Sequence, residues 1–216
     1  MNGHVARPAA AKSCSTALAF VCIAMWLAAA AIARPLGIWL GIGGAAIALG
    51  IAVLIFDRSG TPKALLLPSP RLALIGATAC ALMAAATYAL YPVLARMVPS
   101  VATDTLQLYA AFRSPSPGVA SIAFVPVVVG EELVWRGVVQ ASLVCHVGAW
   151  RGVALTVVVY ALVHAPFGSP LLAPVAFSCG LVWGVLRATT ASLVPTLVAH
   201  ALWDAVILLF LPLDTR

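Results

Sequence analysis

Charged side chains are what this chain has least of. Asp, Glu, Lys and Arg make up 8% of its 216 residues and hydrophobic residues 63%, against about 25% charged and 45–50% apolar residues in an average soluble domain. The apolar runs are too many for the core of a soluble protein of this length. The composition therefore predicts a polytopic integral membrane protein. The net charge of +6 comes from basic residues spread over loop positions, without an arginine cluster or interleaved aromatic residues, so no nucleic-acid partner is predicted.

The chain also lacks several motifs that would have fixed its chemistry. Its five cysteines form no CxxC pair and are predicted to be small apolar residues of helices, not a disulfide framework or a zinc knot: Cys14, Cys22, Cys80, Cys145 and Cys179. The sequence contains no G-x-S-G of a rhomboid-like serine protease, no G-x-G-D of a presenilin-like aspartate protease and no H-E-x-x-H of a site-2-type zinc protease. No internal repeat of 20–50 residues is visible either.

Long apolar runs are what the chain does have. We expect an all-α fold of about seven transmembrane helices, with six to eight as the range, because a crossing needs about 20 apolar residues. A short interfacial helix is expected at residues 105–112. Residues 1–118 would form an N-terminal membrane region with its loop, and 119–213 a helical core. The expected spans are residues 16–33, 36–56, 72–94, 119–145, 152–165, 171–186 and 191–211.

The first run leaves two readings open. Ala31-Ile32-Ala33 resembles a signal-peptide cleavage site, but residues 16–33 are nearer the length of a spanning helix than of the apolar part of a signal peptide. A turn is expected at Arg34-Pro35. With the N-terminus in the cytoplasm, seven Lys and Arg residues lie inside and four outside, which agrees with the positive-inside rule.

The fourth run carries charges at bilayer depth. Glu131-Glu132-Leu133-Val134-Trp135-Arg136 is flanked on both sides by apolar residues. A charge at this depth costs several kcal/mol, so it pairs with another group or faces a cavity and marks a working site. Glu132 and Arg136 are four residues apart and predict an ion pair on one helix face. Glu131 then points about 100° away, without a partner in its own turn.

Two later spans carry polar pairs at the same i, i+4 spacing. Tyr160 precedes His164, and His200 precedes Asp204. Counted from the start of their spans, Glu131, His164 and His200 all lie about 13–18 Å into a hydrocarbon layer of about 30 Å. A lone carboxylate removed from water is a better proton acceptor, which suits Glu131 to general-base catalysis. The second histidine, with Asp204, would stabilise an oxyanion.

The three motifs together resemble the signature of the CPBP family, the CAAX-protease and bacteriocin-processing intramembrane endopeptidases. They are Glu131-Glu132-x-x-x-Arg136, Tyr160-x-x-x-His164 and His200-x-x-x-Asp204, in the family's order on three spans. The resemblance implies that Glu131 activates water with help from His164. It also implies that His200 and the residue at 204 stabilise the oxyanion, with Glu132 and Arg136 as support.

Two positions depart from the family pattern. The second motif commonly opens with Phe, and Tyr160 adds a hydroxyl that can hydrogen-bond nearby. The third motif ends in Asn or Asp, and Asp204 donates a hydrogen bond only when protonated, so it would instead orient His200. Zinc held by Glu131, His164 and His200 is an alternative, but the resemblance favours a glutamate-driven mechanism without a cofactor.

The function predicted from the sequence is therefore an intramembrane endopeptidase of a bacterial inner membrane. Its substrate would be a membrane-associated or C-terminally tagged or lipidated protein, cut near its C-terminus or a membrane-tethered segment. Two rivals remain. One is a non-catalytic scaffold or immunity protein of the same family, and the other is a small proton-coupled transporter, since buried Glu and His also form proton relays.

Overall fold

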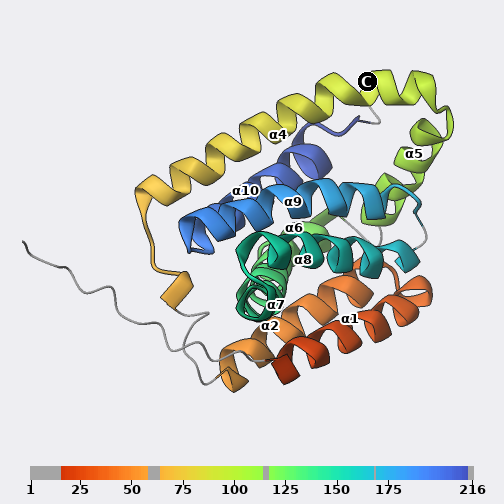
Figure 1. The fold of residues 1–216 in the computed structure, drawn as a ribbon. Coiled ribbons are helices and arrows are strands. Elements are labelled where there is room, and N and C mark those ends of the chain that lie inside the picture. The colour runs from red at the N-terminus through yellow and green to blue at the C-terminus, as the bar shows by residue number, and fades with distance from the viewer. Residues whose placement is uncertain (1–15, 58–63, 114–116, 168, 214–216) are drawn as a thin grey trace, which may run out of the picture.

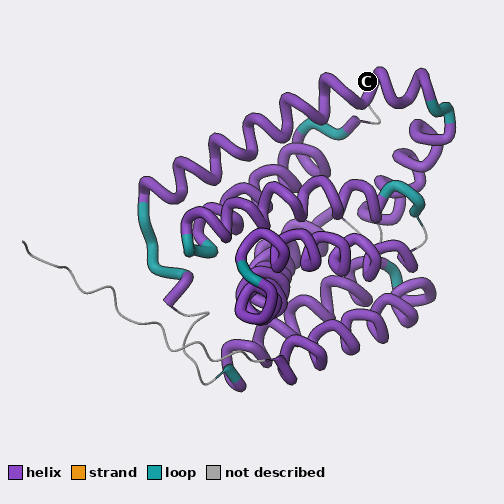
Figure 2. Tube along the Cα trace, viewed as in Figure 1, coloured by secondary structure: helices purple, strands orange, loops and turns teal. Residues whose placement is uncertain are grey.

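A computed structural model describes residues 16–57, 64–113, 117–167 and 169–213 of the chain. Within these ranges every regular element is a helix and none is a strand (Figures 1 and 2). The expected all-α membrane fold is confirmed. Helices are the natural solution for such a chain, because lipid offers no partner for backbone N–H and C=O groups and a helix satisfies them internally.

The helices follow one another with short connections. Three long helical segments contain a π-helical stretch. It begins the segment at residues 39–56, lies inside the segment at 117–147 and ends the segment at 194–210. In chain order the elements are α1 (Thr16–Leu36), η1 (Trp39–Gly43), α2 (Gly44–Phe56), α4 (Pro70–Met97), α5 (Ser100–Arg113), α6 (Pro117–Glu132), η2 (Leu133–Val139), α7 (Gln140–Val147), α8 (Ala149–His164), η3 (Ala165–Phe167), α9 (Leu172–Thr190), α10 (Val194–Asp204) and η4 (Ala205–Phe210).

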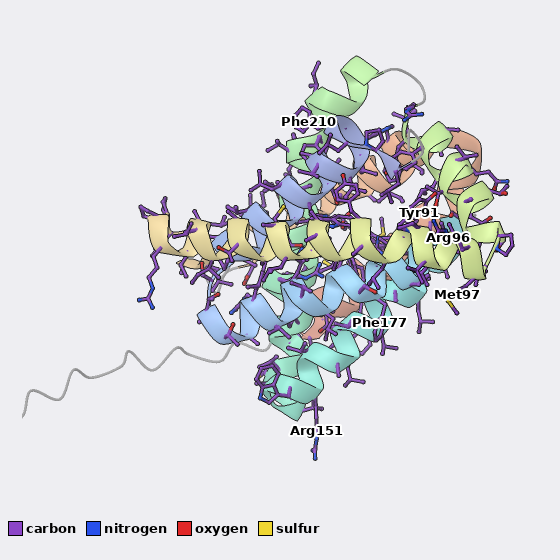
Figure 3. The ribbon with its side chains drawn as sticks, turned by 90° about the horizontal axis from the view of Figure 1, so that it is seen from above. Tyr91, Arg96, Met97, Arg151, Phe177 and Phe210 are labelled. Atoms are coloured by element: carbon purple, nitrogen blue, oxygen red, sulfur yellow. The ribbon has the colours of Figure 1, made fainter. Side chains whose placement is uncertain are left out.

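One rod runs through the middle of the molecule and carries the acidic pair. It consists of α6, η2 and α7, which continue without a break from Pro117 to Val147. Helices α1 and α2 pack on one side of it, and α8, α9 and α10 on the other (Figure 1). Helix α4 lies outside this layer and packs mainly against α10, as the view from above also shows (Figure 3). The residues of η2 are all buried, so this rod forms the core of the fold.

The helix ends follow from local sequence, and two of them differ from expectation. Helix α1 continues through Arg34 and Pro35, and the turn comes at Gly37, whose φ of +81° favours glycine. The turn predicted at Arg34-Pro35 is therefore wrong, because the helix ends at Leu36 and the chain turns at Gly37. The expected interfacial helix is longer than predicted, since α5 covers Ser100–Arg113. Gly148, with φ of +83°, makes the tight turn between α7 and α8.

The prediction for the cysteines is wrong in one case. Cys145 is disulfide-bonded, whereas Cys22, Cys80 and Cys179 are free and buried as expected of apolar helix residues. Widely spaced cysteines without a motif carry no signal for pairing, because pairing depends on which helices become neighbours.

The central rod crosses α2 at very close range. An added Cβ at Gly50 would lie 2.6 Å from Gly130 Cα, and one at Gly130 would lie 2.1 Å from the backbone oxygen of Ala46. Small residues at a crossing let two helix backbones approach closely, which is how helices without a hydrophobic driving force associate in lipid. Gly130 directly precedes Glu131, so this crossing sets the position of the acidic pair.

Three helices are long and apolar enough to cross a membrane by themselves: Trp39–Phe56, Pro70–Met97 and Leu172–Thr190. The shorter apolar helices include Ala149–His164 and Val194–Phe210. Large apolar side chains such as Phe20, Leu74 and Ile122 are exposed on the outside of the bundle, as expected for a protein surrounded by lipid. The chain is a membrane protein.

Candidate active site

A strip of polar side chains on the central rod is fully buried. Arg136 Nη1 lies 3.2 Å from Glu132 Oε1, and both side chains are at most 1% exposed. This is the ion pair expected from their spacing. Arg136 Nη2 also reaches the backbone oxygen of Gly180 at 3.5 Å, and Gln140, one turn further, donates from Nε2 to the oxygen of Gly184 at 2.9 Å. The strip therefore fastens the central rod to α9.

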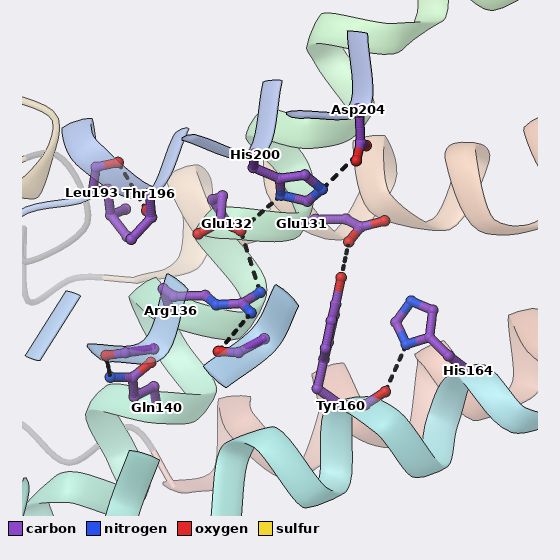
Figure 4. Close-up of polar contacts among 12 residues, drawn as sticks. Glu131, Glu132, Arg136, Gln140, Tyr160, His164, Leu193, Thr196, His200 and Asp204 are labelled. Atoms are coloured by element: carbon purple, nitrogen blue, oxygen red, sulfur yellow. Dashed lines mark hydrogen bonds and ion pairs between the residues drawn. The ribbon is translucent and has the colours of Figure 1, made fainter. Parts of the chain in front are cut away.

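His200 of α10 lies between two carboxylates. Its Nδ1 is 2.9 Å from Glu132 Oε1, and its Nε2 is 3.3 Å from Asp204 Oδ2 (Figure 4). When both carboxylates are ionised, both ring nitrogens carry protons and the imidazole is a cation. The ring also stacks on Trp183, with centroids 3.7 Å apart. The i, i+4 spacing of His200 and Asp204 thus corresponds to a contact, whereas the contact between His200 and Glu132 could not be predicted from the sequence.

Glu131 finds its partner on another helix. The hydroxyl of Tyr160, on α8, donates to Glu131 Oε2 at 2.7 Å, and both residues are buried (Figure 4). The adjacent acidic residues therefore serve different networks. Glu132 belongs to the ion-pair cluster with Arg136 and His200, while Glu131 is held from the side of α8.

His164 lies one turn after Tyr160 on the same helix face. Its Nδ1 is 2.6 Å from the backbone oxygen of Tyr160, and the centroids of the two rings are 4.3 Å apart. A carbonyl oxygen only accepts hydrogen bonds, so Nδ1 is the donor and Nε2 holds the lone pair of the neutral ring. Trp26 of α1 packs against His164 at 6.0 Å between ring centroids and against Trp135 at 5.4 Å.

Each of the three motifs contributes polar residues to the wall of one cavity of about 620 Å³. The rest of its wall is mostly apolar and comes from η1, α4, α5, α6, α9 and η4. Helix α5 closes one part of this wall. It is fixed by a hydrogen bond from Trp39 Nε1 to the oxygen of Phe112 at 2.7 Å, and by one from Tyr109 to the oxygen of Ile207 at 2.6 Å. The motif residues that line the cavity are Glu131, Tyr160, His164, His200 and Asp204.

The residues present do not fit the zinc site considered from the sequence. Both ring nitrogens of His200 contact carboxylates, so His200 offers no lone pair to a metal while both nitrogens carry protons. Over the described ranges, no group of three or more His, Cys, Asp or Glu side chains is arranged to hold a metal ion.

Sequence reasoning missed several residues that shape the site. Trp183 and Trp26 belong to none of the three motifs, yet their rings contact His200 and His164. Gln140 could have been found, because it extends the row of Glu132 and Arg136 by another four residues. Nothing in the spacing of the two tryptophans pointed to the histidines, because those contacts depend on how separate helices pack.

Helix arrangement and site together define an all-α membrane protein with a buried Glu–His–Asp cluster that faces an apolar cavity. Residues 114–206 match the family of Rce1-like type II CAAX prenyl endopeptidases, and this segment carries all three motifs. The match confirms the CPBP resemblance of the three motifs over residues 114–206. The family is one of proteases, which supports peptide hydrolysis as the activity. No curated protein and no solved structure was found that matches the chain.

Proposed function

We propose that the protein is an intramembrane endopeptidase that uses Glu131 to activate a water molecule. The observation that carries the proposal is the shared cavity. It brings together the Glu131 carboxylate, the His164 imidazole and His200, which lies between two carboxylates, in one apolar chamber. Such a chamber keeps charges in a low dielectric, where fixed dipoles and charges act most strongly on a transition state.

The reaction follows from the positions of these groups. Glu131 takes a proton from water, and the hydroxide attacks the carbonyl carbon of the scissile peptide bond. His164, whose Nε2 carries the lone pair, assists by accepting a hydrogen bond from the same water. The C–N bond then breaks, and the proton held by Glu131 passes to the leaving nitrogen.

The negative charge that develops on the carbonyl oxygen needs a counterpart. His200 supplies it, because a ring between Glu132 and Asp204 is held in place and carries positive charge when both carboxylates are ionised. Its Nε2 contact to Asp204 is 3.3 Å, which is long for a charge-assisted hydrogen bond, so this N–H has capacity for a second acceptor. In this mechanism Asp204 orients the ring and does not contact the substrate.

The substrate we propose is a membrane-associated protein with a lipidated or tagged C-terminus. The apolar wall of the cavity suits a substrate that arrives from the lipid. We further propose that the protein resides in a bacterial inner membrane with its N-terminus in the cytoplasm. The distribution of Lys and Arg over the loops supports that orientation.

The test uses purified protein in lipid vesicles. A farnesylated peptide ending in a CAAX sequence is incubated with wild type, Glu131→Gln and Asp104→Asn, and products are read by mass spectrometry. Asp104 is a carboxylate outside the cavity lining and serves as the matched control. In parallel, the C-termini of membrane proteins are compared between host cells that express wild type and Glu131→Gln.

Cleavage by wild type and Asp104→Asn, with loss of cleavage in Glu131→Gln, supports the proposal. If Glu131→Gln cleaves as fast as wild type, the mechanism is wrong. If wild type changes neither the peptide nor any membrane C-terminus, the protein is a non-catalytic relative or a transporter, and uptake assays in the same vesicles separate those two.

A further inference from the structure

The hydrogen bond between Tyr160 and Glu131 is the feature that sets this chain apart from the family pattern, in which the second motif commonly opens with Phe. The hydroxyl donates to one carboxylate oxygen, Oε2, at 2.7 Å. Of the two oxygens, Oε1 is then the one that no group of the described protein engages. We propose that Tyr160 is a positioning residue that holds the Glu131 carboxylate so that Oε1 faces the hydrolytic water. The inference rests on the proposed function and adds a role for Tyr160 to it.

The ring of Tyr160 is itself held from several sides. Trp135 meets it edge-on at 5.1 Å between centroids, Trp183 does so at 6.5 Å, and the guanidinium carbon of Arg136 lies 4.6 Å from its centre. Gly180 leaves the space the ring needs, since an added Cβ there would lie 3.0 Å from Tyr160 Cδ1. A side chain so enclosed has one position, and its hydroxyl is a fixed point for Glu131.

Fixing the carboxylate matters because Glu has several freely rotating bonds. A general base contributes most when its accepting oxygen is already aimed at the proton, since a small misplacement loses much of the rate. Without the hydroxyl, no hydrogen bond from the described residues would distinguish the two carboxylate oxygens of Glu131. The bond from Tyr160 makes the two oxygens inequivalent and leaves one for the water.

The simpler reading is that the hydroxyl merely finds the nearest acceptor in a buried place. The two readings differ in what removal of the hydroxyl does. Tyr160→Phe keeps the ring and all its aromatic contacts, so it should fold like wild type. The matched control is Tyr88→Phe, which removes a hydroxyl bond to the backbone of Leu211 outside the cavity lining.

The experiment measures peptide cleavage and an infrared spectrum on the same vesicle samples. We expect kcat of Tyr160→Phe to fall about tenfold or more while KM stays within about twofold, as the loss of one hydrogen bond to a charged group implies. The stretching band of the Glu131 side chain, identified from the difference between wild type and Glu131→Gln, should shift in Tyr160→Phe and stay in place in Tyr88→Phe. Gly180→Ala, which pushes on the ring but keeps the hydroxyl, should give a smaller loss in kcat.

An unchanged kcat and an unshifted Glu131 band in folded Tyr160→Phe would overturn the proposal. So would a change of equal size in Tyr88→Phe. Failure of the proposed function looks different, because the wild type itself would then cleave nothing, while the infrared comparison would still report whether the hydroxyl holds the carboxylate.

Discussion

The indole of Trp183 lies flat against the imidazole of His200, with ring centroids 3.7 Å apart and an angle of 19° between the planes. The guanidinium carbon of Arg136 lies 5.1 Å from the same indole. An indole face attracts a cation, so Trp183 stabilises His200 most strongly in the charged form that its proposed role toward the oxyanion requires.

Replacement of Trp183 by Leu should therefore lower activity more than stability. A desolvated cation–π contact is worth about 2 kcal/mol, so kcat should fall roughly 10- to 30-fold. Trp150→Leu is the control, because Trp150 is exposed and distant from the cavity lining. Equal kcat in the two variants, measured on the same substrate, would show that the stack does not support catalysis.

Breaking the buried ion pair should unfold the protein before it affects chemistry. Arg136→Met removes the guanidinium that pairs with Glu132 and leaves His200 as its partner, and removal of one member of a buried pair costs about 3–5 kcal/mol of stability in other proteins. Chemical unfolding in mixed micelles measures the loss, with Arg151→Met as the exposed control. The double variant Glu132→Gln with Arg136→Met should regain folded protein but not activity, because His200 loses a carboxylate partner. Wild-type stability of Arg136→Met would contradict this account.

Two glycines of α2, one at the crossing with the central rod and one away from it, give a matched pair of alanine variants. Gly50→Ala would push α2 away from Gly130 and should destabilise the protein by about 1–3 kcal/mol, while also shifting Glu131 and reducing cleavage. Gly44→Ala meets nothing within 4 Å and should be neutral or gain up to about 1 kcal/mol from helix propensity. Unfolding and cleavage assays on both variants test this. A tolerated alanine at 50 would mean that the backbones can separate freely.

The first helix should prove necessary for the site, although it lies outside the matched family region. Trp26 is fully buried between Trp135 and His164, so Trp26→Ala should cost about 3–5 kcal/mol and most of the cleavage activity. Phe20→Ala, on the same helix but 70% exposed, should change neither quantity much. Unfolding in mixed micelles and peptide cleavage provide the comparison, and a fully active Trp26→Ala would remove α1 from the site.

Chelation should leave the enzyme active. Because both nitrogens of His200 contact carboxylates, we expect cleavage to persist after incubation with a strong chelator, with zinc well below one ion per chain by elemental analysis. Loss of activity that added zinc restores would require His200 to leave Glu132 or Asp204, and would replace the glutamate mechanism with a metal-assisted one.

The sequence predicted the fold well because lipid leaves few choices. Apolar runs separated by Pro, Gly and charged residues gave each long helix to within a few residues at most ends. The turn after α1 was placed at Pro35, two residues before Gly37, whose positive φ marks the actual turn. The disulfide of Cys145 could not be predicted, since pairing depends on the packing of segments distant in sequence.

The site was predictable where its contacts lie within one helix. The pairs Glu132–Arg136 and His200–Asp204 follow from i, i+4 spacing, and both are present. Contacts between helices could not be predicted from the sequence, as the hydrogen bonds from Tyr160 to Glu131 and from His200 to Glu132 show. The periodicity of a helix says which face a residue occupies, but not which neighbour that face will meet.

The π-helical turn Leu133–Val139 directly follows the acidic pair. Such turns are usually read as an extra residue absorbed into an α-helix, and an extra residue changes the direction of everything after it by about 100°. The side chains before and after the π-helical turn therefore point in directions that are set separately. Glu131 points toward the cavity, and Gln140 points toward α9. Deletion of a single residue from this segment would keep the helix and its acidic pair but would turn Gln140 away from α9. Related sequences should therefore vary less in the length of this segment than in its residue types.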